Sequence, residues 1–81
     1  MVRVSGKQDV DQLLLRLGTA IRTRRLATGL SQEALADAAG VDRSHMGKIE
    51  RGERNVTTLL LIDVAGALDV TVASLFEDAR L

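Results

Sequence analysis

The chain has 81 residues with eleven basic and eleven acidic side chains, so its formal net charge is zero. It contains no cysteine, which excludes disulfides and cysteine-ligated metal sites, and the single His45 cannot form a metal site alone. No apolar run is long enough for a signal peptide or a membrane span, so we expect a soluble cytoplasmic protein without a membrane partner. A chain of this length forms one small domain of modest stability.

Residues 1–8 show no sustained periodicity and are expected to form a flexible N-terminal tail. A basic arm acting through Arg3 and Lys7 is the less favoured interpretation. The single domain then spans residues 9–81.

The first helix is expected to begin at Asp9, because Asp9 followed by Gln12 has the form of a capping box. Gly29 ends this helix. Its predicted buried stripe consists of Val10, Leu13, Leu14, Leu17 and Ile21.

Residues 32–51 have the pattern of two short helices joined by a tight turn. Ser31 is a suitable N-cap for the first helix and Asp42 for the second. Gly40 permits a left-handed turn between the helices, and Gly52 ends the second. The inward positions are Leu35, Ala36, Ala39, Val41, Met46 and Ile49. This pattern predicts a helix-turn-helix whose second helix fits a DNA groove.

Polar side chains cover the outer face of that second helix. They are Arg43, Ser44, His45 and Lys48. The loop that follows brings three further donors near the helix end, namely Arg51, Arg54 and Asn55. We expect these three to contact the DNA backbone, the alternative being a solvated loop.

Two glycines interrupt predicted helices. Gly47 costs its helix about 1 kcal/mol relative to alanine, so either the backbone approaches DNA closely there or the helix tolerates the loss. Gly66 raises the same question in a later helix, where it permits close packing across a dimer.

The charges are unevenly distributed. Residues 1–30 contain six basic side chains against two acidic ones, whereas residues 57–81 contain one against four. A molecule with this asymmetry can present one positive face to DNA despite its zero net charge. Arg22 and Arg24, near the end of the first helix, either contact phosphates or form a solvated face.

Two more helices follow. Thr57 or Thr58 caps one that runs to about Leu68, and Thr71 caps another from Val72 to about Ala79. With no strand signal, the fold class is all-α, a compact five-helix bundle. These helices contain more apolar residues than one buried face needs, and exposed apolar surface usually marks a partner. The predicted homodimer interface consists of Leu59, Leu60, Ala67, Val72 and Phe76.

The chain resembles the phage-repressor-like, or XRE-type, family of helix-turn-helix regulators. The matching segments are RTRRLATGLSQEALADAAGVDRSHMGKIERGERN and LLLIDVAGALDVTVASLF. The IERGERN segment followed by a capping threonine is similar to the small controller proteins of restriction–modification systems.

This resemblance implies roles for individual residues. Arg25 and Glu50 match a partly buried ion pair that joins the first helix to the recognition helix, and Gln32 matches a phosphate-contact position. The implied base-reading positions are Arg43, Ser44 and Lys48, with His45 beside them.

The sequence therefore predicts a dimeric, sequence-specific regulator of transcription that binds a near-palindromic operator and controls its own restriction–modification operon. An antitoxin or phage-type repressor of the same fold is the alternative, followed by a protein-interaction module. We expect no cofactor, metal or small-molecule ligand. Catalysis is disfavoured because His45 and Ser44 are helix neighbours that do not face each other.

Overall fold

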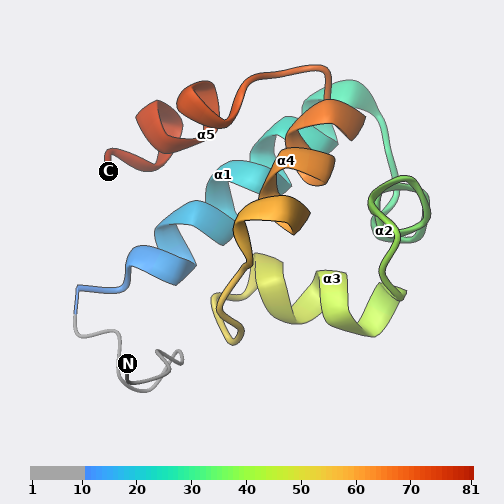
Figure 1. The fold of residues 1–81 in the computed structure, drawn as a ribbon, viewed down its shortest axis with the longest axis horizontal. Helices are drawn as coiled ribbons and strands as arrows, with labels where there is room; N and C mark the ends of the chain where they lie inside the picture. Colours follow the sequence, from blue (N-terminus) through green and yellow to red (C-terminus); the bar gives the residue numbers. More distant parts are fainter. Residues whose placement is uncertain (1–10) are drawn as a thin grey trace.

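The computed structural model describes residues 11–81, which form five α-helices and no strand (Figure 1). The helices are α1 (Leu13–Thr28), α2 (Gln32–Ala39), α3 (Arg43–Glu50), α4 (Thr58–Ala67) and α5 (Val72–Ala79). The predicted all-α class and the five helices are confirmed. The predicted tail over residues 1–8 lies outside the described residues.

Local side-chain caps define where the later helices begin. The cap side chains of Ser31, Asp42, Thr57 and Thr71 each accept a hydrogen bond from a backbone N–H three residues later. The predicted caps are confirmed, and Thr57 rather than Thr58 is the N-cap of α4. Gly29 and Gly40 end α1 and α2 in the left-handed conformation, as predicted.

The predicted start of α1 is wrong. The helix begins at Leu13, and Gln12 adopts a left-handed φ of 55° with no capping hydrogen bond from its side chain. Asp9 and Val10 lie outside the described part of the chain. Leu13 is exposed and Leu14 is only partly buried, so the fully buried part of the predicted stripe begins at Leu17.

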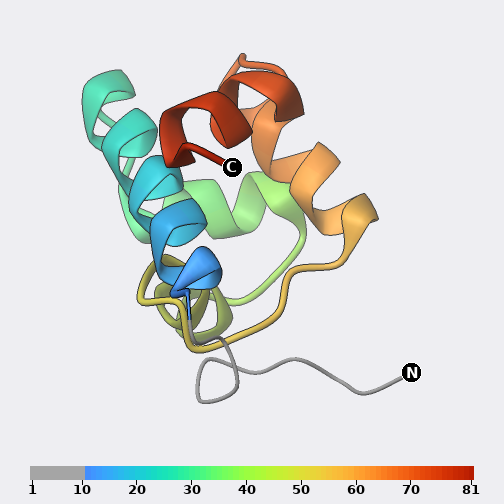
Figure 2. The same ribbon diagram turned by 90° about the vertical axis from the view of Figure 1, so that its left-hand side faces the viewer.

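A single core joins all five helices. Its buried apolar residues include Leu17, Ile21, Leu35, Met46, Ile49, Leu61, Val64 and Leu75. Figures 1 and 2 both show α5 and α3 at opposite ends of the molecule, with α1 extending between them. No single helix within residues 11–81 is long and apolar enough to cross a membrane, and only α4 and α5 together reach that length and hydropathy, across a bend of 95°.

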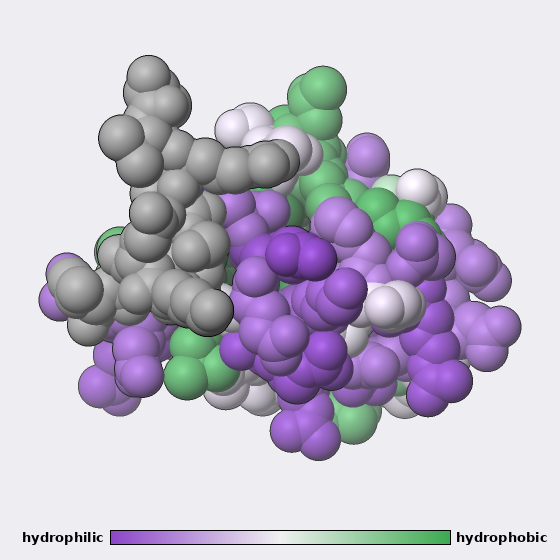
Figure 3. Space-filling view, turned by 90° about the horizontal axis from the view of Figure 1, so that it is seen from below, coloured by the Kyte–Doolittle hydropathy of each residue, from purple (hydrophilic) through white to green (hydrophobic). Residues whose placement is uncertain are grey.

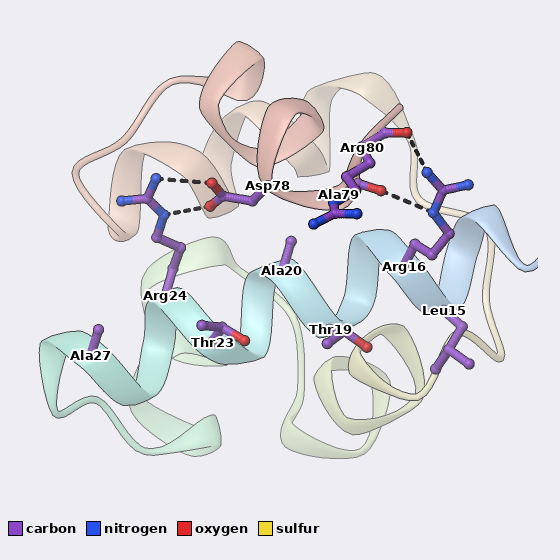
Figure 4. Close-up of a pocket in the computed structure, with 10 residues that line it drawn as sticks. All are labelled: Leu15, Arg16, Thr19, Ala20, Thr23, Arg24, Ala27, Asp78, Ala79 and Arg80. Carbon is purple, nitrogen blue, oxygen red and sulfur yellow. Dashed lines mark hydrogen bonds and ion pairs between the residues drawn. The ribbon is translucent and has the colours of Figure 1, made fainter.

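Two arginines of α1 bind the end of α5 (Figure 4). Arg16 Nε donates to the carbonyl oxygen of Ala79 at 3.0 Å, and Arg16 Nη2 donates to that of Arg80. Arg24 forms a two-point ion pair with Asp78 at 2.6 and 3.3 Å, which raises the pKa of the Arg24 guanidinium. Arg24 therefore binds α5. The sequence predicted for it either a phosphate contact or a position on a solvated face, and neither included this ion pair.

The α1 backbone closely approaches the C-terminal end of α3. A Cβ atom at Gly18 would lie 2.3 Å from the carbonyl oxygen of Ile49 and 2.6 Å from that of Glu50. A Cβ at Gly52 would lie 2.5 Å from Leu15 Cα, and Gly52 also has a φ of 73°. Glycine at both positions lets α1 hold the end of α3 and the turn that follows.

We expect Gly18→Ala to lower the free energy of unfolding by about 1–3 kcal/mol, because the added methyl group meets backbone atoms that cannot move independently. The matched control is Gly66→Ala in α4, where no atom of the same chain lies within 4 Å of the added Cβ. Because Gly66 lies beside the predicted dimer interface, both variants are compared at a protein concentration at which they are monomers. This control should stabilise the protein by up to about 1 kcal/mol through helix propensity. Urea unfolding measures both, and equal shifts would show that the close approach at Gly18 is unimportant.

Candidate nucleic-acid interface

The second helix of the helix-turn-helix, α3, buries one face and presents the other to solvent. Met46 and Ile49 are buried in the core. Arg43 and Ser44 are exposed, while His45 and Lys48 are half-buried. The end of the molecule that contains α3 is covered largely by hydrophilic side chains (Figure 3). The four predicted base-reading residues therefore lie on one short helix, with Arg43 and Ser44 the most accessible.

A buried ion pair joins the end of α1 to the end of α3. Arg25 Nε donates to Glu50 Oε2 at 2.8 Å, and Arg25 Nη2 donates to Glu50 Oε1 at 3.1 Å. The two side chains are only 8% and 1% exposed. Arg25 Nη1 also donates to the carbonyl oxygen of Leu30 at 3.0 Å, so the chain after α1 is held by the same guanidinium. The structure thus contains the ion pair that the family resemblance implied.

Gln32, at the start of α2, binds the same carboxylate. Its Nε2 donates to Glu50 Oε1 at 3.0 Å. This hydrogen bond fixes the side chain beside α3.

Two shallow hollows gather several of the predicted DNA contacts beside α3. One, of about 570 Å³, is lined by Arg22, Gln32, Glu50 and Arg51 among other residues. The other, of about 370 Å³, is lined by Gln32, Arg43, Ser44, Gly47 and Arg51. Gln32 and Arg51 border both hollows. The exposed Arg54 and Asn55 lie in the following loop and border neither of these two.

Gly47 makes room for these side chains. A Cβ atom at Gly47 would lie 3.1 Å from Arg51 Nη1 and 3.6 Å from Gln32 Oε1. Gly47 itself is buried. From the sequence, Gly47 could either allow DNA to approach the helix backbone or simply be tolerated by the helix. In the structure, the atoms nearest to its missing side chain belong to Arg51 and Gln32.

Arg51 is paired with a residue that the sequence interpretation did not single out. Arg51 Nε lies 2.5 Å from Glu53 Oε2, and both side chains are more than half exposed, at 57% and 51%. The hydrogen bond from Arg51 lowers the pKa of Glu53, with further contributions from the charges of Arg51, Lys48 and Arg54. Glu53 is therefore ionised at neutral pH among three cations.

The predicted dimer interface is only partly exposed. Leu59 is 75% exposed and Phe76 is 38% exposed. Leu60, Ala67 and Val72 are partly buried against the core, so each offers less surface to a partner than Leu59 does. Ile62, which the prediction omitted, is 50% exposed and lies three residues after Leu59 on the same face of α4.

Residues 11–81 contain no group of three or more His, Cys, Asp or Glu side chains placed to hold a metal ion. The only histidine of the chain, His45, lies on α3.

A helix-turn-helix family model matches residues 21–75 of the chain. The chain therefore belongs to this helix-turn-helix family, the XRE type that its sequence resembles. Within the family it is similar to control protein C.SmaI of Serratia marcescens, with 44% identity over 67 residues, which span 83% of this chain and 76% of that protein. It is also 33% identical to control protein C.MunI of a Mycoplasma species over 70 residues, which span 85% and 95% of the two chains.

Solved structures of controller proteins have the same fold. The restriction–modification controller protein C.AhdI from Aeromonas hydrophila matches with a TM-score of 0.76 and 46% identity, covering 78% of this chain and 96% of that one. The structure of C.Esp1396I bound to a 19 base pair DNA duplex matches with a TM-score of 0.76 and 34% identity, covering 84% and 91%. The predicted resemblance to controller proteins is confirmed.

We expect Arg25→Leu to lower the free energy of unfolding by about 3–5 kcal/mol, because it leaves the Glu50 carboxylate buried without its cation. The same substitution one residue earlier, Arg24→Leu, breaks a partly exposed pair and should hardly change the urea midpoint. The double variant Arg25→Leu/Glu50→Leu should recover part of the loss. If Arg25→Leu and Arg24→Leu unfold at the same urea concentration, the buried pair is no more important for stability than the partly exposed one.

Proposed function

We propose that this protein is a dimeric, sequence-specific regulator of transcription in the cytoplasm that controls its own restriction–modification operon. The observation that carries the proposal is the exposed polar face of α3, flanked by the hollows that Gln32 and Arg51 border. Its similarity to C.Esp1396I, whose structure includes a DNA duplex, supports DNA as the ligand of this face.

The side chains divide into base-reading and backbone-binding groups. Arg43, exposed in the first turn of α3, can donate two parallel hydrogen bonds to guanine in the major groove. Ser44, His45 and Lys48 complete the base-reading set. The backbone-binding set is Gln32, Arg22, Arg51, Arg54 and Asn55, which fix the position of the protein on the duplex.

The dimer forms through the outward face of α4. Leu59, Ile62 and Gly66 are exposed and recur at helical spacing, and Gly66 leaves open space beside the helix backbone. Phe76 of α5 is also partly exposed and belongs to the predicted interface. A two-fold axis through this face gives an isologous dimer, and its two α3 helices enter successive major grooves about 34 Å apart.

DNase footprinting on the DNA upstream of the gene tests the proposal. We expect paired half-sites to be protected in stages as protein is added, and protection to weaken steeply as salt rises from about 0.05 to 0.2 M. A single symmetric site over the promoter would instead indicate a plain repressor or antitoxin. Protection no stronger than on random DNA would contradict the proposal.

Two arginine variants sharpen this test. Arg43→Ala should relax base preference at one position of each half-site, at a cost of about 1–3 kcal/mol for the preferred base. Arg54→Ala should weaken binding to all sequences alike. A uniform loss in both variants would contradict the division into reading and backbone groups.

We expect Leu59→Asp to convert the protein into a monomer in sedimentation velocity, because it places a charge on the apolar α4 face. Leu26→Asp is the matched control, since Leu26 is also more than half exposed but lies on α1. This control should remain dimeric. A wild-type monomer at high micromolar concentration, with no dimer formed on DNA, would contradict the proposed interface.

A further inference from the structure

Arg51 occupies a central place among the proposed phosphate contacts. It borders both hollows beside α3, and its Nη1 lies against the space above Gly47. Its Nε, however, is already bound by Glu53 at 2.5 Å. A phosphate that approaches Arg51 from solvent therefore encounters a guanidinium that already forms an ion pair with a carboxylate.

The backbone holds Glu53 in this position. Its N–H donates to the carbonyl oxygen of Lys48 at 2.9 Å, in the turn that ends α3. Gly52, just before it, lies against the backbone of Leu15 in α1. The backbone of Glu53 is thus fixed at the end of the recognition helix, and its half-exposed carboxylate is held there by the ion pair with Arg51.

The surrounding charges make Glu53 a competitor for anions. Lys48, Arg51 and Arg54 all act on its carboxylate, and Arg51 and Arg54 belong to the proposed backbone-binding set. An anion placed among these cations offsets part of the positive potential that attracts DNA. Because phosphate contacts carry no sequence information, this effect applies equally to all DNA sequences.

We propose that Glu53 is an affinity-limiting residue that competes with a DNA phosphate for Arg51. This inference rests on the proposed function, since it assumes that the α3 face binds DNA. It assigns to Glu53 the role of keeping the protein from accumulating on random DNA, where phosphate contacts supply essentially all of the binding. Binding to a specific site then depends more on the base contacts made by α3.

The test compares Glu53→Gln with the wild type on two probes, a random duplex and the duplex upstream of the gene, at several salt concentrations. We expect Glu53→Gln to bind both duplexes about 3–10-fold more tightly, with a log–log salt slope steeper by up to about one unit. Glu77→Gln is the matched control, because it removes the same charge from the exposed surface of α5, at the far end of the molecule from α3. It should change neither quantity.

Arg51→Ala and the double variant Arg51→Ala/Glu53→Gln separate competition from a general charge effect. If Glu53 competes for Arg51, the gain from Glu53→Gln falls at least severalfold when Arg51 is absent. The inference would be overturned if Glu53→Gln raised the affinity of the Arg51→Ala variant as much as that of the wild type. It would also be overturned if Glu53→Gln did not raise the affinity of the wild type. Upstream DNA that binds wild type and Glu53→Gln equally would overturn it while leaving the proposed function intact. A wild type that does not prefer upstream DNA would count against the proposed function instead, and a complete lack of DNA binding would overturn both.

Discussion

The geometry of this domain depends on one buried carboxylate. Glu50 accepts two hydrogen bonds from Arg25 and one from Gln32, so a single side chain near the end of α3 is bound from both α1 and α2. A buried ion pair adds little net stability, but its hydrogen bonds are directional. Their role here is to fix the orientation of α3 relative to the first two helices, which is what a rigid recognition surface requires.

The close backbone contacts of α1 also constrain the orientation of α3. Gly18 meets the last carbonyl groups of α3, and Leu15 meets Gly52 in the next turn. Polar contacts through Glu50 and steric contacts through the two glycines therefore constrain the same end of the recognition helix. Together with the buried side chains of Met46 and Ile49, they hold α3 in one orientation against α1.

Sequence reasoning succeeded at most positions where the cause is local, the exception being the capping box that Asp9 and Gln12 predict at the start of α1. The caps at Ser31, Asp42 and Thr71 depend on residues within one turn, and they were predicted correctly. It failed where distant segments decide the outcome. Helical periodicity could not separate Leu60 from Leu59, because the depth of each on α4 depends on the helices packed around it. The roles of Gly47 and Glu53 likewise depend on the conformation of the Arg51 side chain, which lies over Gly47 and pairs with Glu53.

The structure also changes what the charge distribution means. The sequence places four arginines in α1, but Arg16 binds the end of α5, Arg24 binds Asp78 and Arg25 binds Glu50. Among these four, only Arg22 has a side chain with neither a hydrogen bond nor an ion pair within residues 11–81. The positive face beside α3 is therefore smaller than the basic N-terminal half suggests. The cations that remain beside α3 are Arg22, Arg43, Lys48, Arg51 and Arg54, and the carboxylate of Glu53 offsets part of their attraction for DNA. Base contacts then supply more of the specific affinity.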